Sequence, residues 1–204
     1  MKFSGREVRD LLVAWLALGV AFTFFFERDL VAALMSGDVV PMQFATVLVL
    51  SLATAGVAFL LHELAHKVVA VQFGQLAEFR ADYGMLFLAV AGGLAGFLFA
   101  APGAVYHQGR STLRENGLIA LAGPVTNVAL GFLFLPLVLV GPGFVADVGY
   151  RGAQINFILA GFNMLPWGPL DGNTVRKWST PVFLAVLVPT VLLALFVMFP
   201  TLFV

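Results

Sequence analysis

Long apolar runs separated by short polar patches make up most of the chain. Five runs are read as membrane spans, at about residues 11–26, 42–73, 117–140, 153–166 and 182–204. A helix needs about 20 mostly apolar residues to cross a bilayer. A sixth run, at 85–101, is apolar but interrupted by glycines at 92, 93 and 96. The pattern predicts an all-α polytopic membrane protein with about five to six transmembrane helices.

The run at 85–101 decides the topology, because it either crosses the membrane or enters and returns. Cytoplasmic loops are normally enriched in Lys and Arg. With six spans and an inner N-terminus, and leaving out Lys67 at a helix end, these residues divide equally, five on each side. With five spans, and leaving out Lys67 at a helix end, two lie outside and eight inside: Lys2, Arg6, Arg9, Arg80, Arg110, Arg114, Arg176 and Lys177. We therefore favour a re-entrant segment at 85–101; the alternative is a glycine-rich packing helix.

Composition agrees with a membrane protein and narrows the chemistry. The chain is 61% hydrophobic and 11% charged, whereas soluble domains are about 45–50% apolar and about 25% charged. The net charge is zero, so no basic excess points to nucleic acid as a partner. Cysteine is absent, so His and carboxylate side chains must hold any transition metal. We expect one integral-membrane domain over residues 1–204, with a catalytic core at about 42–176.

The second span carries an H-E-x-x-H pattern formed by His62, Glu63 and His66. Helical residues four apart lie on one face, about 6 Å from each other. The two imidazoles can therefore bind one zinc ion, and Glu63 can accept a proton from a water molecule there. The alternative is two histidines with local hydrogen bonds, but three ionisable groups at bilayer depth are costly without a function.

Asp171 is the candidate for a third metal ligand, since catalytic zinc typically has three protein ligands and one open position. It follows the fourth span, and both histidines lie near the C-terminal end of the second. Asp171 and the two histidines lie on the same side of the membrane only if exactly one full crossing lies between these two spans. Five spans satisfy this condition and six do not. The alternative is an ordinary turn aspartate before Gly172.

Asn127 lies in the third span, within Gly123-Pro124-Val125-Thr126-Asn127. Proline kinks a helix, and an asparagine in lipid needs a partner. The side chain could bind an unwound substrate or simply join two helices, and the sequence leaves both roles open.

Three motifs together resemble the site-2 protease family of intramembrane zinc metalloproteases, over about residues 59–176. They are His62-Glu63-x-x-His66, Gly123-Pro124-x-x-Asn127 and Asn163-x-x-Pro166 followed by Leu170-Asp171-Gly172. The resemblance implies zinc held by His62, His66 and Asp171, with Glu63 as general base. It also implies a membrane-dipping β-hairpin after the first motif, which fits 85–101.

Other consequences of the resemblance concern the substrate. Asn163 matches the family asparagine that precedes the metal aspartate, and we expect it to position substrate. Gly168 departs from the family, which often has proline there, and this is expected to loosen the substrate-facing turn. We expect a minimal member without a PDZ or CBS domain.

The predicted activity is hydrolysis of peptide bonds within or near transmembrane segments of membrane-anchored proteins. The family implies single-pass membrane substrates and the lipid bilayer as surroundings. We expect a multi-pass protein of the cell membrane, with the N-terminus and the opening of the active site on the cytoplasmic side. The alternatives are a metal-ion transporter that uses the same His and Asp side chains, a membrane metalloprotease with glutamate as third ligand, and an inactive chaperone-like relative. The sequence does not indicate an oligomeric state.

Overall fold

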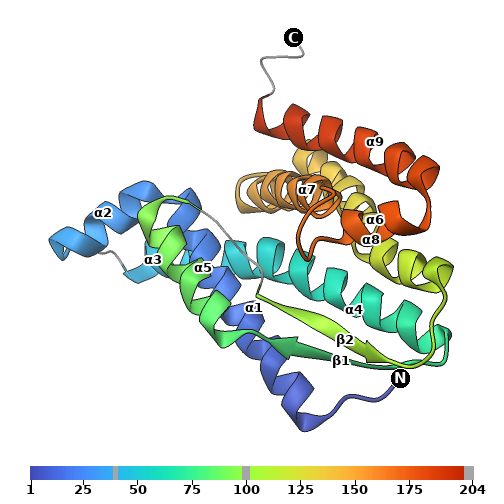
Figure 1. The fold of residues 1–204 in the computed structure, drawn as a ribbon. Helices are drawn as coiled ribbons and strands as arrows, with labels where there is room; N and C mark the ends of the chain where they lie inside the picture. The colour runs from blue at the N-terminus through green and yellow to red at the C-terminus, as the bar shows by residue number, and fades with distance from the viewer. Residues whose placement is uncertain (39–40, 98–101, 200–204) are drawn as a thin grey trace. The chain divides into compact units, whose positions relative to one another are not determined.

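The structure is a computed structural model that describes residues 1–38, 41–97 and 102–199. The described chain is mostly helical and contains one two-stranded sheet (Figure 1). It divides into two compact units, one formed by residues 2–60 and 78–106 and the other by residues 61–77 and 107–204 together with Met1. Each unit is described by itself.

The unit of residues 2–60 and 78–106 is built on the long helix α1 (Gly5–Phe26). Helices α3 (Pro41–Ser51) and α5 (Tyr83–Ala95) pack against α1, as does a π-helical turn at Leu52–Gly56. Trp15 Nε1 donates to the Leu52 carbonyl at 3.0 Å and ties this turn to α1. The short helix α2 (Arg28–Ser36) follows α1 directly.

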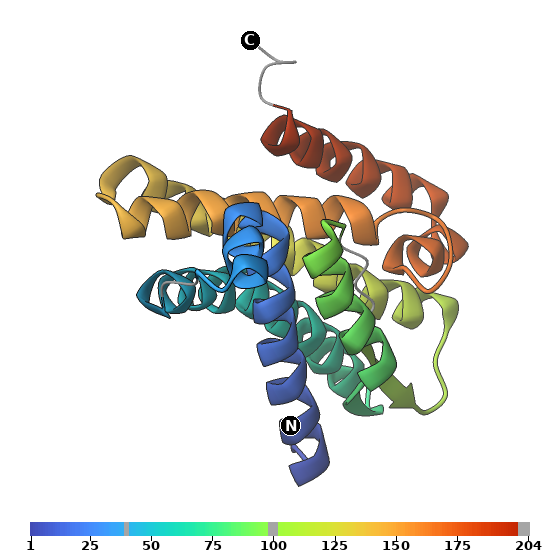
Figure 2. The same cartoon turned by 90° about the vertical axis from the view of Figure 1, so that its left-hand side faces the viewer.

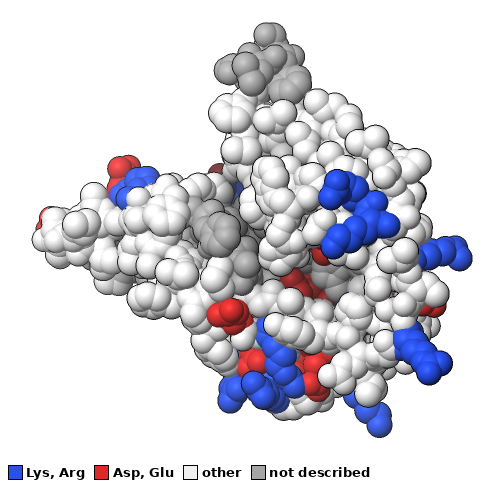
Figure 3. Space-filling view, in the orientation of Figure 1, with Lys and Arg blue, Asp and Glu red and all other residues white. Residues whose placement is uncertain are grey.

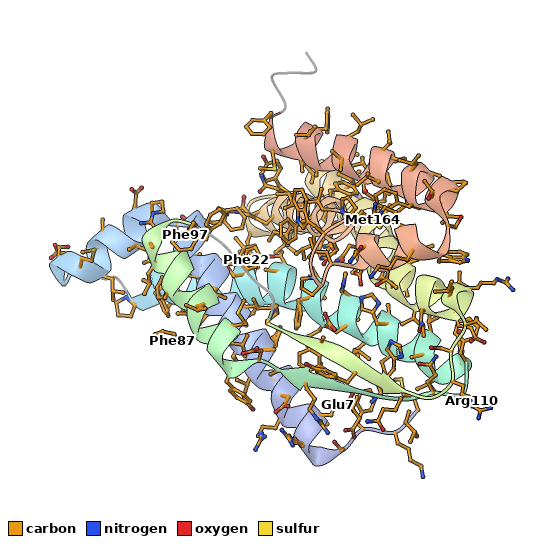
Figure 4. The ribbon with its side chains drawn as sticks, viewed as in Figure 1. Glu7, Phe22, Phe87, Phe97, Arg110 and Met164 are labelled. Carbon is orange, nitrogen blue, oxygen red and sulfur yellow. The ribbon has the colours of Figure 1, made fainter. Side chains whose placement is uncertain are left out.

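Two paired strands, β1 (Leu76–Ala81) and β2 (Gly103–Gln108), flank α5 in sequence. The Phe79 amide donates to Glu7 Oε1 at 3.0 Å, so β1 is held by a side chain that is fully buried on α1 (Figure 4). The expectation of a β-hairpin at 85–101 is therefore right in kind but displaced, because its strands lie on either side of that segment.

The segment expected to re-enter the membrane is helical as far as Ala95, and residues 98–101 lie outside the described part. The Asp82 side chain caps the helix by accepting from the Met85 amide at 3.0 Å. Gly92 and Gly93, which interrupt the apolar run, lie inside α5, where Gly93 allows close packing. A β carbon on Gly93 would lie 2.3 Å from the Ala21 carbonyl oxygen of α1.

The unit of residues 61–77 and 107–204 contains most of α4 (Val57–Gln72) and all of α6 (Leu113–Val140), α7 (Phe144–Asn163), α8 (Asp171–Trp178) and α9 (Thr180–Met198). Helix α7 packs against α6 on one side and α9 on the other (Figure 2). Helix α8 packs against α6 and α9.

In the part of the chain that the structure describes, four helical stretches are long and apolar enough to cross a membrane: Gly5–Phe26, Pro41–Gln72, Leu113–Val140 and Thr180–Met198. They match four of the five predicted spans. The remaining one, at 153–166, corresponds to α7, which begins earlier and ends at Asn163. The helices α2 and α8 were not predicted, because they lie in polar stretches.

Large apolar side chains are widely exposed, as expected for surfaces that lie in lipid. On α6, Leu133, Leu139 and Val140 are 70%, 86% and 78% exposed. The face drawn in Figure 3 carries its charges in a few clusters and is uncharged over α9. With four candidate spans among the described residues, the chain is a multi-pass membrane protein.

Candidate metal centre

Three side chains from α4 and α8 converge on one point. His62 Nε2 and His66 Nε2 lie 3.0 Å apart, and Asp171 Oδ2 lies 3.2 Å from the first and 3.4 Å from the second. Both histidines are buried and Asp171 is largely so. They form the one group of three or more His or acidic residues close enough to share a metal ion within 1–38, 41–97 and 102–199.

Hydrogen bonds on the far side of each imidazole determine which nitrogen carries a proton. His66 Nδ1 lies 2.7 Å from the Ile119 carbonyl, which can only accept, so Nδ1–H donates. His62 Nδ1 donates in the same way to Asn127 Oδ1 at 2.5 Å. Each ring therefore turns the lone pair of its Nε2 toward Asp171.

The cluster needs a positive charge at its centre. Asp171 Oδ2 is buried and accepts no hydrogen bond from the described residues. Three electron-pair donors that face one another repel unless a proton or a metal ion lies between them. Two imidazole nitrogens and one carboxylate oxygen are a donor set that zinc accepts in catalytic sites, and the Nδ1–H hydrogen bonds are those usual for metal-binding histidines. The residues fit a zinc ion.

Apolar packing places Asp171 at the start of α8. A buried core of Ala120, Met164, Val175 and Phe183 joins α6, the segment after α7, α8 and α9 (Met164 is labelled in Figure 4). Gly172 lets α8 begin directly against this segment, because a β carbon there would lie 2.0 Å from the Met164 carbonyl oxygen. The aspartate therefore reaches α4 from a fixed helix end.

The Asp171 carboxyl is ionised at neutral pH. Burial raises its pKa, but the charge that His66 carries when its Nε2 is protonated outweighs burial and lowers the pKa to about 2. The site therefore offers an anionic oxygen ligand beside two imidazoles.

Helix α6 approaches the ligands unusually closely at Gly123. A β carbon at this position would lie 2.5 Å from the Nε2 atoms of both His62 and His66. The next residue, Pro124, has no N–H for the Ala120 carbonyl, so the helix lacks one internal hydrogen bond here. Gly123, in the second motif, therefore leaves no side chain between the α6 backbone and the proposed metal position.

Glu63 is buried, with 8% of its surface exposed. It follows His62 on α4, and its charge acts on His66. A carboxylate in this place is within the site but is not a member of the three-residue cluster.

Two asparagines predicted from the motifs take different positions. Asn163 is the last residue of α7, is partly buried, and donates from Nδ2 to the Leu159 carbonyl at 3.0 Å. Asn127 is fully buried, with its Oδ1 on His62 and its Nδ2 donating to Asn156 Oδ1 of α7 at 2.8 Å. Of the two roles left open for Asn127, these contacts match the joining of helices. Substrate binding by Asn127 or Asn163 stays a prediction.

Sequence reasoning did not identify Asn156 as part of the site. The signal was present, since Asn156 is a polar residue inside a predicted span, as is Asn127. The third histidine, His107, lies exposed on β2 and is not a member of the cluster.

Comparison with known proteins decides the family. Over 202 residues, the chain is 41% identical to "Putative zinc metalloprotease MJ0611" of Methanocaldococcus jannaschii, and the match covers 97% of both chains. The chain belongs to the site-2 protease family of zinc metalloproteases. In this family the H-E-x-x-H segment and the later aspartate are the expected metal-binding motifs, and here they are the residues that converge.

More distant relatives agree with membership of the site-2 protease family. The chain is 33% identical over 125 residues to "Putative zinc metalloprotease Rip3" of Mycobacterium tuberculosis, which covers 59% of this chain and 28% of that protein. It is 30% identical over 149 residues to "Putative zinc metalloprotease YwhC" of Bacillus subtilis. This match covers 61% of this chain and 66% of that protein. No family model matches the chain, and no solved structure matches it significantly.

Proposed function

We propose that this chain is an intramembrane zinc endopeptidase that hydrolyses peptide bonds within or near transmembrane segments of membrane-anchored proteins. The observation that carries the proposal is the convergence of His62, His66 and Asp171 beside a buried glutamate. A site built only to pass metal ions has no need of Glu63.

The proposed mechanism assigns one task to each residue. His62, His66 and Asp171 hold zinc, which when bound supplies a Lewis acid that polarises the scissile carbonyl and lowers the pKa of water to about 7. Glu63 accepts the proton of the attacking water and returns it to the leaving amine. The fixed Nδ1–H hydrogen bonds keep the two imidazoles from turning during this proton transfer.

We assign substrate positioning to Asn163 and the irregular segment after it. Residues 164–170 separate α7 from α8 and include Pro166 and Pro169, which cannot donate backbone hydrogen bonds. A single-pass substrate helix must unwind before its carbonyls can react, and an irregular partner segment leaves backbone groups for it to pair with. Single-pass membrane proteins are the substrate class we propose.

The proposed topology has five spans and one re-entrant segment. At 1.5 Å per residue, the 13 residues of α5 extend about 20 Å, whereas the hydrocarbon core is about 30 Å thick. The 20 residues of α7 are long enough to cross. With the N-terminus in the cytoplasm, the metal site opens to the cytoplasmic side. We treat residues 1–204 as one membrane domain with its catalytic core at about 42–176.

The test compares wild type, Asp171→Ala and Glu63→Gln in detergent-purified protein. Zinc content is measured together with cleavage of a labelled single-span peptide that carries a helix-breaking Asn-Pro pair. The proposal predicts about one zinc per chain in wild type, loss of zinc and cleavage in D171A, and loss of cleavage alone in E63Q. Full zinc retention by D171A would contradict the ligand set.

The competing function is metal transport through the same His and Asp side chains. It is tested with the same variants in proteoliposomes loaded with a zinc-sensitive dye. Equal zinc entry into the liposomes with wild-type protein and with E63Q, together with no cleavage of the peptide, would support metal transport and contradict the protease function.

A further inference from the structure

A chain of hydrogen bonds runs from the backbone of α7 through α6 to a metal ligand on α4. Asn156 Nδ2 donates to the Gly152 carbonyl at 2.8 Å, Asn127 Nδ2 donates to Asn156 Oδ1 at 2.8 Å, and Asn127 Oδ1 lies 2.5 Å from His62 Nδ1. Both asparagines are fully buried. Water therefore does not compete for these groups.

The backbone carbonyl at one end fixes the direction of every bond. The Gly152 carbonyl can only accept, so the amide nitrogen of Asn156 faces it and the amide oxygen faces Asn127. Asn127 must then present its nitrogen to Asn156 and its oxygen to His62. His62 is left to donate from Nδ1, which keeps the lone pair of Nε2 on the side of Asp171.

We propose that Asn156 is a positioning residue of the metal centre. Through Asn127 it holds His62 in the tautomer and the orientation that bind zinc. Asn156 lies two hydrogen bonds away from the ligand and touches neither the ion nor the substrate. The inference rests on the proposed zinc site. It gives Asn127 a role inside the protein in place of a contact with substrate.

The alternative is that Asn156 only joins α6 to α7, as asparagines do in many membrane helices. The two roles differ when Asn156 is replaced by leucine. Leucine at this position removes the acceptor that orients the Asn127 amide. An amide turned with its nitrogen toward His62 would make His62 accept at Nδ1 and carry its proton on Nε2. In the joining role, the same change lowers stability but leaves the zinc affinity of the folded protein unchanged.

The experiment is a double-mutant cycle on zinc affinity, measured by chelator competition with detergent-purified protein. The variants are Asn156→Leu, Asn127→Asp and the two combined. A carboxylate at position 127 has only acceptors, so it holds the His62 Nδ1–H without help from Asn156. We expect N156L to weaken zinc binding about 10- to 100-fold in the wild-type background. In the N127D background the loss should be less than about threefold, because the orientation of His62 no longer depends on Asn156.

A matched control lies two residues away on the same helix. Gln154 Nε2 donates to the Val197 carbonyl of α9 at 3.4 Å and is not connected to the metal site. Gln154→Leu should keep wild-type zinc affinity. Thermal unfolding of each variant shows that the compared proteins are folded. If N156L does not fold, Asn156→Ser takes its place, since its short hydroxyl can bond back to the Gly152 carbonyl but lacks the amide oxygen that accepts from Asn127.

Each outcome decides between the two roles. Zinc affinity unchanged in N156L, or an equal loss in both backgrounds, overturns the positioning role and leaves Asn156 as a helix-joining residue. Failure of wild-type protein to bind zinc is a different result, because it removes the proposed function itself.

Discussion

The α carbon of Gly123 faces His66 so closely that a β carbon added to it would lie 2.5 Å from the imidazole Nε2. This distance is well inside van der Waals contact, and the atom it meets is the proposed metal-binding atom of His66. The glycine of the second motif is therefore required by the geometry of the metal site.

Gly123→Ala should weaken zinc binding by about tenfold or more, as loss of a supporting contact does at other metal sites, because the added methyl group displaces both imidazoles. The measurement is zinc affinity by chelator competition. Gly131→Ala is the matched control on the same helix: its β carbon would lie 2.4 Å from the Phe157 ring, away from the ligands. The explanation fails if both variants lose zinc affinity equally.

Gly168→Pro should destabilise the protein, although the family often has proline at this position. Gly168 has a φ of +58°, whereas proline requires about −65°. Gly168→Ala should cost about 1–2 kcal/mol, with open space around its methyl group, and the proline variant should cost more. Thermal unfolding in detergent measures both. A proline variant as stable as wild type would show that the segment takes another path.

Arg28→Leu should loosen the C-terminal end of α5. Arg28 Nη1 donates to the Gly93 and Leu94 carbonyls at 2.9 and 3.0 Å, which closes the last turn of the helix. Hydrogen bonds from charged groups contribute about 1.5–3 kcal/mol, so amide exchange near the end of α5 should accelerate by roughly tenfold to a hundredfold. Exposed Arg110 (Figure 4) gives the control, Arg110→Leu, which should leave this exchange rate unchanged.

Removal of zinc should lower the stability of the unit that holds the metal site. A ligand present at 1,000 times its Kd stabilises the folded state by about 4 kcal/mol. Hydrogen exchange before and after chelation should show the change in α6 and α8 and not in α1 or α5, which belong to the other unit. The same treatment of Asp171→Ala should have no effect, and a chelator effect in that variant would mean that the metal binds elsewhere.

The grouping of the three proposed ligands could be predicted because it follows from helix periodicity and from the proposed topology. His62 and His66 share a face through their spacing of four, and the proposed topology, with one crossing between the second and fourth spans, places Asp171 on their side of the membrane. The structure brings these three side chains together. Neither argument depends on the details of packing, which is why both work from the sequence.

The position of the strands and the role of Asn156 could not be predicted in the same way. Residues 85–95 combine apolar character with glycines, a pattern that fits a tight turn as well as a helix packed on α1, and only the contact of Gly93 with Ala21 distinguishes them. Asn156 was visible as a polar residue in a span. Its partner, however, depends on the rotation of α7 against α6, which sequence spacing does not determine.

The three electron-pair donors of the metal site are made at different times, since Asp171 is added to the growing chain 105 residues after His66. At about 5–20 residues per second, translation of this interval takes roughly 5–20 s. Throughout that time the nascent protein carries both histidines and Glu63 but has no third ligand. The nascent chain therefore cannot complete the proposed site during this interval, so the order of synthesis delays the proposed activity until Asp171 has been added.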